Sequence, residues 1–318
     1  MIEIFRTPNY NFIGNRRWAY LLSGLITLIG FVSLATQGLR YYIDFTGCTL
    51  VQVRFEKTPT VGDIRKALSR IGMGESIIQE FGSTSEFIIR APLTAASSEE
   101  LTKKVERALA AEPSLAKPEI RRVEFVGPQV GKELQWQAIY AVVFGLIGIL
   151  LYIALRFDLK GGVAAVMAVF HDVIVCLGAM SLMHREFSLP VLAALLTIIG
   201  YSVNDTIVAY DRLRENRGKT TVRGRPFAEQ MNDAVNQTLS RTVLTALTVF
   251  LSTAILLAFG GKTLEDFAFV LFVGVITGTY STTYVAAALV VDWTLYVEGR
   301  LGARKKRLAK GGEARKIT

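Results

Sequence analysis

The chain has 318 residues, of which 51% are hydrophobic and 20% are charged, and its mean hydropathy is +0.37. The hydrophobic residues form long uninterrupted blocks instead of periodic stripes, which excludes an ordinary soluble domain and indicates membrane spans. The net charge is +9, and the basic residues that produce it cluster beside those blocks, which fits the positive-inside rule better than a nucleic-acid-binding face.

The first apolar block covers residues 18–36 and follows two arginines, Arg16 and Arg17. Its small residues near the end, Ser33 and Ala35, would also suit a cleaved signal peptide. The long lead before the block and its length, near the roughly 20 residues that a span needs, favour a retained anchor. We expect a cytoplasmic N-terminus at 1–17 and a first transmembrane helix at 18–37.

Residues 38–135 are polar and mixed in periodicity, which predicts a folded domain outside the membrane. Strand-like and helix-like segments alternate in the order β-α-β-β-α-β, that of a ferredoxin-like split βαβ unit. The segments are strands at 50–55, 76–81, 86–90 and 119–126, and helices at 60–71, capped by Thr60, and from Ser97 or Ser98 to 111. The domain has no histidine and its carboxylates are scattered, so docking or movement is a better expectation than catalysis.

Five further apolar blocks bring the expected number of spans to about six, within a membrane region at 136–292. They cover residues 138–155, 161–183, 189–210, 242–259 and 267–291. Basic residues are concentrated in the 211–240 loop and the 293–318 tail. By the positive-inside rule, this predicts that both termini lie in the cytoplasm and that the 38–135 domain lies on the opposite side of the membrane. We expect the tail to be a cytoplasmic retention signal that attracts anionic lipid, with a specific partner or the ribosome as the alternative.

The stretch 189–216 carries the most informative polar residues. Asp205 is the first formal charge within this stretch, and a carboxylate at that depth costs roughly 2.5–3.5 kcal/mol, so it needs a role or a partner. Asn204 adjoins it, and Tyr201 and Ser202 share its helical face. We favour a proton- or ion-responsive site over a structural polar anchor.

Two further polar sites lie within the spans. His171 and Asp172 occupy the middle of the third span, where a structural pin between helices and a role in proton handling are equally consistent with the sequence. Arg241 opens the fifth span, where an interfacial arginine would snorkel to the headgroups. Because Asp205 lies toward the same side of the membrane, the two can reach each other, and protonation of Asp205 would release such a pair.

The chain lacks the usual marks of an enzyme. It has no P-loop, no H-E-x-x-H and no G-x-S-x-G sequence, so we expect no catalytic residues, cofactor or metal. Cys48 and Cys176 lie in different contexts, without ligand spacing or a disulfide partner. Energy would then come from an ion gradient, worth about 2.3 kcal/mol per charge per 100 mV.

Several sequence motifs together resemble the SecF members of the SecD/SecF family of protein-export membrane proteins. They are YIDFTGCT at 42–49, VGPQVG at 126–131, HDVI at 171–174, IGYSVNDTIV at 199–208 followed by Asp211 and Arg212, and QTLSRT at 237–242. The resemblance covers nearly the whole chain in order. One departure is Cys48, where the family usually has glycine; a positive φ there would strain it.

The resemblance implies an α-helical polytopic membrane protein in the bacterial inner membrane. Its six helices would form half of a transporter of the resistance-nodulation-division (RND) superfamily, with a ferredoxin-like domain between helices 1 and 2. It implies SecD as the other half, and SecYEG, SecA indirectly, unfolded preprotein and lipid as partners, with YajC and YidC as further candidates and no nucleic acid. It also implies that Asp205 and Arg241 belong to a path driven by the proton-motive force, while H⁺ and Na⁺ both stay open.

Other functions are also compatible with such a chain. A small-molecule or lipid exporter of the same superfamily would usually carry both halves and larger paired domains. A passive assembly factor would tolerate Asp205→Asn, whereas a proton-coupled subunit would not. An intramembrane enzyme lacks candidate catalytic residues.

Overall fold

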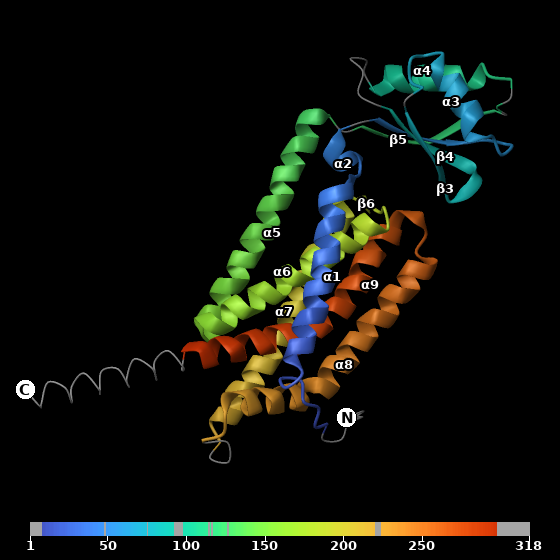
Figure 1. Cartoon of the computed structure of the whole chain (residues 1–318). Helices are drawn as coiled ribbons and strands as arrows, with labels where there is room; N and C mark the ends of the chain where they lie inside the picture. The colour runs from blue at the N-terminus through green and yellow to red at the C-terminus, as the bar shows by residue number, and fades with distance from the viewer. Residues whose placement is uncertain are drawn as a thin grey trace, which may run out of the picture.

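The computed structural model describes residues 8–47, 49–74, 76–91, 98–113, 115, 117–125, 127–219 and 224–297. Within these residues, six helices are long and apolar enough to cross a membrane, which confirms the expected spans. They form a bundle with a small α/β domain at one end (Figure 1). We call this the domain end, and the opposite end of the bundle the far end.

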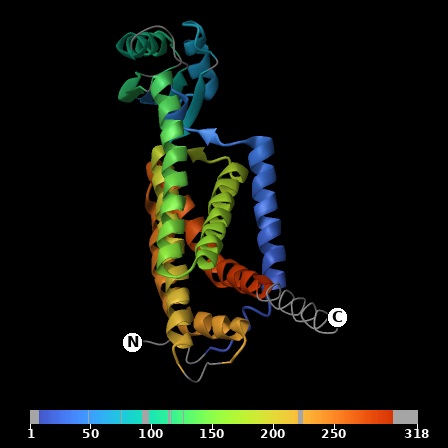
Figure 2. The ribbon, with the colours of Figure 1, turned by 90° about the vertical axis from the view of Figure 1, so that its left-hand side faces the viewer.

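The first five helices are longer than the apolar blocks that predict them, and the last span divides into α9 and the helical turns that follow it. The six are α1 (Arg16–Gln37), α5 (Pro128–Arg156), α6 (Leu159–Leu182), α7 (Leu189–Arg217), α8 (Phe227–Phe259) and α9 (Lys262–Ser281). α5 starts within the segment assigned to the soluble domain, because Gly127 and a proline at the first position suit a helix N-terminus. The first part of α8 lies across the far end of the bundle (Figure 2).

The six helices divide into an inner and an outer set. About half of the most apolar stretch of α6, α7 and α9 is buried within this chain, against 6% of that of α5 and 11% of that of α8. The outer helices present large apolar side chains, among them Phe144, Leu155 and Phe259. Helices that are apolar on their exposed faces suit lipid or a neighbouring membrane subunit.

Glycines permit the closest helix crossings. A Cβ on Gly178 of α6 would lie 2.4 Å from Cα of Gly30 in α1, and one on Gly278 of α9 would lie 3.2 Å from Cβ of Ser202 in α7. Gly145 and Gly148 of α5, whose spacing in the sequence would also suit close helix packing, lie differently. Both face open space, so they serve no packing among the described residues.

The last span contains an irregular turn. α9 continues directly into the π-helix η2 (Thr282–Ala286), after which the helix extends to residue 297. Its red end departs from the direction of α9 and crosses the far end of the bundle (Figure 1). A π-bulge is a recognised cause of such kinks and is frequent at functional sites.

The domain has the expected ferredoxin-like topology. Its elements are β2 (Thr49–Arg54), α3 (Val61–Ser69), β3 (Ile77–Phe81), β4 (Ser83–Ala91), α4 (Ser98–Ala110) and β5 (Glu119–Phe125). The antiparallel sheet has the order β3-β4-β2-β5, and both helices pack on it around Phe55, Leu68 and Phe87. Thr60 caps α3 in a reciprocal capping box with Asp63, whereas the alternative cap Ser97 lies outside the described residues.

A short junction connects the domain to the bundle. β1 (Arg40–Tyr41) pairs in parallel with β6 (Glu186–Phe187), which lies between α6 and α7. The helix α2 (Ile43–Thr46) follows and ends at Gly47, whose φ of 65° favours glycine. Gly131 of α5 lies so close to α2 that a Cβ would be 3.0 Å from the Phe45 carbonyl oxygen. Cys48 lies outside the described residues.

Ion pairs strengthen this junction. Arg90 of β4 forms a 2.5 Å salt bridge with Glu186, and both side chains are largely buried. Arg185, the residue before Glu186, binds Asp266 at 2.8 Å and Glu265 at 3.1 Å near the start of α9. The domain is therefore tied through one loop to α6, α7 and α9.

Candidate functional site

Asp172 lies on α6 at the centre of the inner helices and is only 1% exposed. Its Oδ2 accepts hydrogen bonds from Ser202 Oγ of α7 and Ser281 Oγ of α9, both at 2.7 Å. Its Oδ1 lies 3.1 Å from Nδ1 of His171. One carboxylate thus joins the three inner helices.

Hydroxyl groups continue this polar cluster into the π-helix. Thr282, the first residue of η2, donates to the Ser202 carbonyl at 3.2 Å and lies 3.2 Å from the hydroxyl of Thr206. Gly278, one turn before Thr282, gives the two helices the room to approach. The irregular turn is therefore bonded to α7 directly beside Asp172.

Asp205 lies one turn after Ser202 on α7 and is 3% exposed. Unlike Asp172, it has a buried oxygen, Oδ2, that finds no hydrogen-bond partner in the described chain. The hydroxyl of Tyr201, one turn earlier, is a second buried oxygen without a hydrogen-bond partner in the described chain. A buried polar atom without a partner costs about 1–3 kcal/mol, and more when charged, so this part of α7 is incomplete in the isolated chain.

The other two residues expected in the ion path lie differently. Arg241 of α8 is exposed and makes no salt bridge with Asp205 in the part of the chain described, although it is the charged group whose field acts on that carboxylate. Asn204 is exposed on α7, near Gly200, which faces open space. The structure thus groups Asp205 with Tyr201 and Ser202, and leaves Asn204 and Arg241 outside the buried face.

Sequence reasoning missed the polar residues of the last span. Ser281 and Thr282 complete the cluster around Asp172, and Thr206 joins them from α7. A signal was present: residues 277–283, TGTYSTT, form a dense run of hydroxyl side chains within an otherwise apolar span. Such runs in a membrane helix suit interhelical hydrogen bonds.

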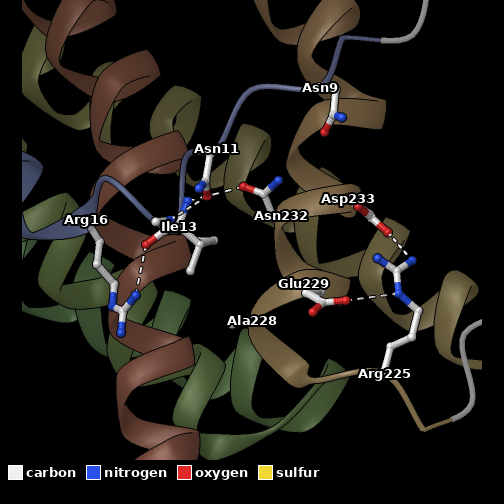
Figure 3. Close-up of a pocket in the computed structure, with 10 residues that line it drawn as sticks. Asn9, Asn11, Ile13, Arg16, Arg225, Ala228, Glu229, Asn232 and Asp233 are labelled. Carbon is white, nitrogen blue, oxygen red and sulfur yellow. Dashed lines mark hydrogen bonds and ion pairs between the residues drawn. The ribbon is translucent and has the colours of Figure 1, made fainter.

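A cavity of about 330 Å³ lies at the far end, away from the two buried aspartates. It separates the N-terminal segment from the start of α8 (Figure 3). Asn232 accepts a hydrogen bond from the backbone of Ile13, and Arg225 pairs with Glu229 and Asp233. The bond to Asn232 fastens the N-terminal segment to α8, whereas the pairs of Arg225 hold the start of α8 itself. No group of three or more His, Cys, Asp or Glu residues that could hold a metal occurs among the described residues.

Residues 105–295 match the family model described as "Protein export membrane protein SecD/SecF, C-terminal". The chain belongs to the SecD/SecF family. The protein translocase subunit SecF of Desulfurispirillum indicum is 44% identical over 295 residues, or 91% of this chain and 94% of that protein. SecF of Pseudomonas aeruginosa is 39% identical over 93% of this chain and 95% of its own length.

Solved structures of SecDF show the same architecture. The crystal structure of SecDF from Thermus thermophilus, described as a translocon-associated membrane protein, is 43% identical and superposes with a TM-score of 0.79. It matches 90% of this chain, which spans 39% of that longer protein. SecDF in a super-membrane-facing form is 40% identical, with a TM-score of 0.70. The fold is thus that of an SecD/SecF-family membrane protein with six spans and one ferredoxin-like domain.

Proposed function

We propose that this chain is the SecF subunit of the Sec protein-translocation machinery and couples an ion gradient to the export of unfolded proteins. The observation that carries the coupling is Asp205, a buried carboxylate in a span, with one oxygen that the described chain leaves without a partner. An ionised carboxylate is costly there, and protonation removes the charge. Binding of a proton to Asp205 therefore shifts the equilibrium between two arrangements of α7.

Arg241 supplies the electrostatic counterpart of this switch. In the described structure its side chain is exposed and forms no salt bridge with Asp205. A second arrangement in which the two pair would favour the ionised carboxylate, and protonation would release that pair. The membrane potential supplies about 2.3 kcal/mol per charge per 100 mV, enough to drive such a change. We assign the chain no chemical reaction of its own.

SecD is the partner that would complete the exposed face of α7. Thr197, Gly200 and Asn204 lie exposed along this helix, and an exposed amide within a membrane favours a neighbouring protein helix over lipid. The Thermus relative is a single SecDF chain, so both halves occur together there. We extend this proposal to the wider export machinery. SecYEG, YajC and YidC are then further partners, and SecA acts indirectly.

The basic residues set the proposed orientation in the bacterial inner membrane. Arg212, Arg214 and Arg217 end α7 at the far end, and Arg225 follows shortly after. By the positive-inside rule, the far end and both termini face the cytoplasm, and the ferredoxin-like domain faces outward. The domain then stands where exported chains emerge.

The test is protein export in vesicles containing Asp205→Asn together with SecD, with and without a gradient. Asp211→Asn, on the same helix but exposed, is the matched control. We expect Asp205→Asn to assemble with SecD and lose the gradient-stimulated part of export, while Asp211→Asn keeps it. A full response in Asp205→Asn would leave a passive assembly role instead. Separate H⁺ and Na⁺ gradients identify the coupling ion.

A further inference from the structure

We propose that Asp172 is a positioning residue for the ion path, whose carboxylate holds α7 against the π-helix and thereby sets the proton affinity of Asp205. This inference rests on the proposed function of Asp205. Asp172 acts through Ser202 and Ser281.

The spacing on α7 makes this connection direct. Ser202 precedes Asp205 by three residues, so the two side chains share a face and are separated by about 4.5 Å along the helix axis. The 2.7 Å hydrogen bond from Ser202 to Asp172 fixes the rotation of α7 about its axis. A rotation of α7 would carry Asp205 out of its buried position, where it is 3% exposed.

The last span is held by the same carboxylate. Ser281, which is fully buried, donates to the same oxygen of Asp172, and Thr282 bonds the Ser202 carbonyl at 3.2 Å. The change from α-helix to π-helix begins at Thr282. The irregular turn is thus the place where α9 is bonded to α7, and Asp172 lies between them.

The groups that surround Asp172 differ from those around Asp205. Two hydroxyl groups donate to one oxygen of Asp172. The titratable groups that face it are His171 and Cys176 on its own helix, and Tyr280 of α9 stands 6.4 Å from the His171 ring. α7 contributes only hydroxyl groups to it. Asp205 instead faces Tyr201 of its own helix and Arg241 of α8.

A purely structural pin would hold the helices together without affecting Asp205. Both roles predict that loss of Asp172 lowers stability, so stability alone does not separate them. Only the positioning role predicts that a change at Asp172 or Ser202 alters the pH at which Asp205 takes up its proton. That pH is therefore the quantity to measure.

The experiment uses the full chain with SecD in vesicles. A hydrophobic carbodiimide modifies protonated carboxyl groups within the membrane, and mass spectrometry measures modification of Asp205 as a function of pH. The variants are Asp172→Asn, Ser202→Ala and the matched control Ser33→Ala, which removes a buried 2.8 Å hydroxyl bond between α1 and α6. We expect a shift of about one pH unit, a tenfold change in proton affinity, in the first two variants and none in the control.

Three results would overturn the inference. One is an unchanged midpoint for Asp205 in Asp172→Asn, or in Ser202→Ala if the first variant fails to assemble. Another is modification of Asp172 itself near neutral pH, because it would then be a proton carrier. A third is an equal shift in Ser33→Ala. By contrast, gradient-driven export that survives Asp205→Asn would overturn the proposed function, so the two failures are distinguishable.

Discussion

Asp172 and Asp205 are the same residue type at similar burial, 1% and 3% exposed, yet their surroundings differ. Asp172 has partners on α6, α7 and α9, whereas Asp205 has an oxygen with none in the described chain. Fully satisfied polar groups rigidify a core, and partly satisfied ones are costly. Burial alone therefore does not decide the role of an acid in a membrane; its hydrogen-bond partners do.

The difference follows from helix packing. Gly278 lets α9 approach α7 beside Asp172, so hydroxyl groups from both helices reach its carboxylate. Asp205 is subject to the field of Arg241 on α8, an outer helix of which few residues are fully buried. The inner site is closed by this chain, and the second site is left for a partner helix or for a change of state.

Asp172→Ala is expected to have the largest effect on stability. Removal of this acceptor takes away two hydrogen bonds to a charged group, each worth about 1.5–3 kcal/mol. We expect a loss of about 3–5 kcal/mol in the free energy of unfolding, measured by denaturant unfolding in detergent micelles. A loss below about 1 kcal/mol would mean that the cluster around Asp172 is not structural.

A third polar site, the junction between Arg90 and Glu186, tests whether completed ion pairs stabilise the region outside the membrane as well. Arg90→Glu places like charges together where the side chains are 11% and 21% exposed. We expect it to destabilise the domain's attachment by about 2–4 kcal/mol, measured by hydrogen exchange in β1 and β6. Glu186→Arg in the same chain should restore protection, and failure of this charge exchange would show that the pair does not hold the domain.

The two hydroxyl donors sharpen the description of the Asp172 site. Ser202→Ala and Ser281→Ala each remove one donor, and we expect each to cost about 1–3 kcal/mol of unfolding free energy. Ser281 also lies 3.1 Å from the Gly278 carbonyl, so part of its bonding is local. Because both donors share one oxygen, the double variant should differ from the sum of the single effects in a double-mutant cycle. Strict additivity would count against a shared acceptor.

The smallest effect on stability is expected at Asp205. An amide in place of this carboxylate removes the charge and loses no hydrogen bond made by Oδ2 in the described chain. Asp205→Asn should change the free energy of unfolding by less than about 1 kcal/mol, because the carboxylate and the amide that replaces it leave the same buried position without a partner. The same unfolding measurement checks it. A loss as large as that of Asp172→Ala would make Asp205 a structural anchor.

The spans and the domain topology follow from local features of the sequence. Span length and uninterrupted hydrophobicity are local properties, and so are the strand alternation of β2 and the capping signal at Thr60. For the same reason the sequence located the buried acids, Asp172 and Asp205, as polar residues within apolar segments. The positions of the sites were therefore predictable.

The hydrogen-bond partners of these two acids depend instead on how the helices pack. Ser281 is separated from Asp172 by 109 residues, and the contact exists because Gly278 allows close approach and the π-helix turns the last span. Arg241 lies at a depth that permits a pair with Asp205, but no such salt bridge forms in the described structure. Depth along a helix follows from residue number, whereas the direction of a side chain depends on how each helix is rotated against its neighbours.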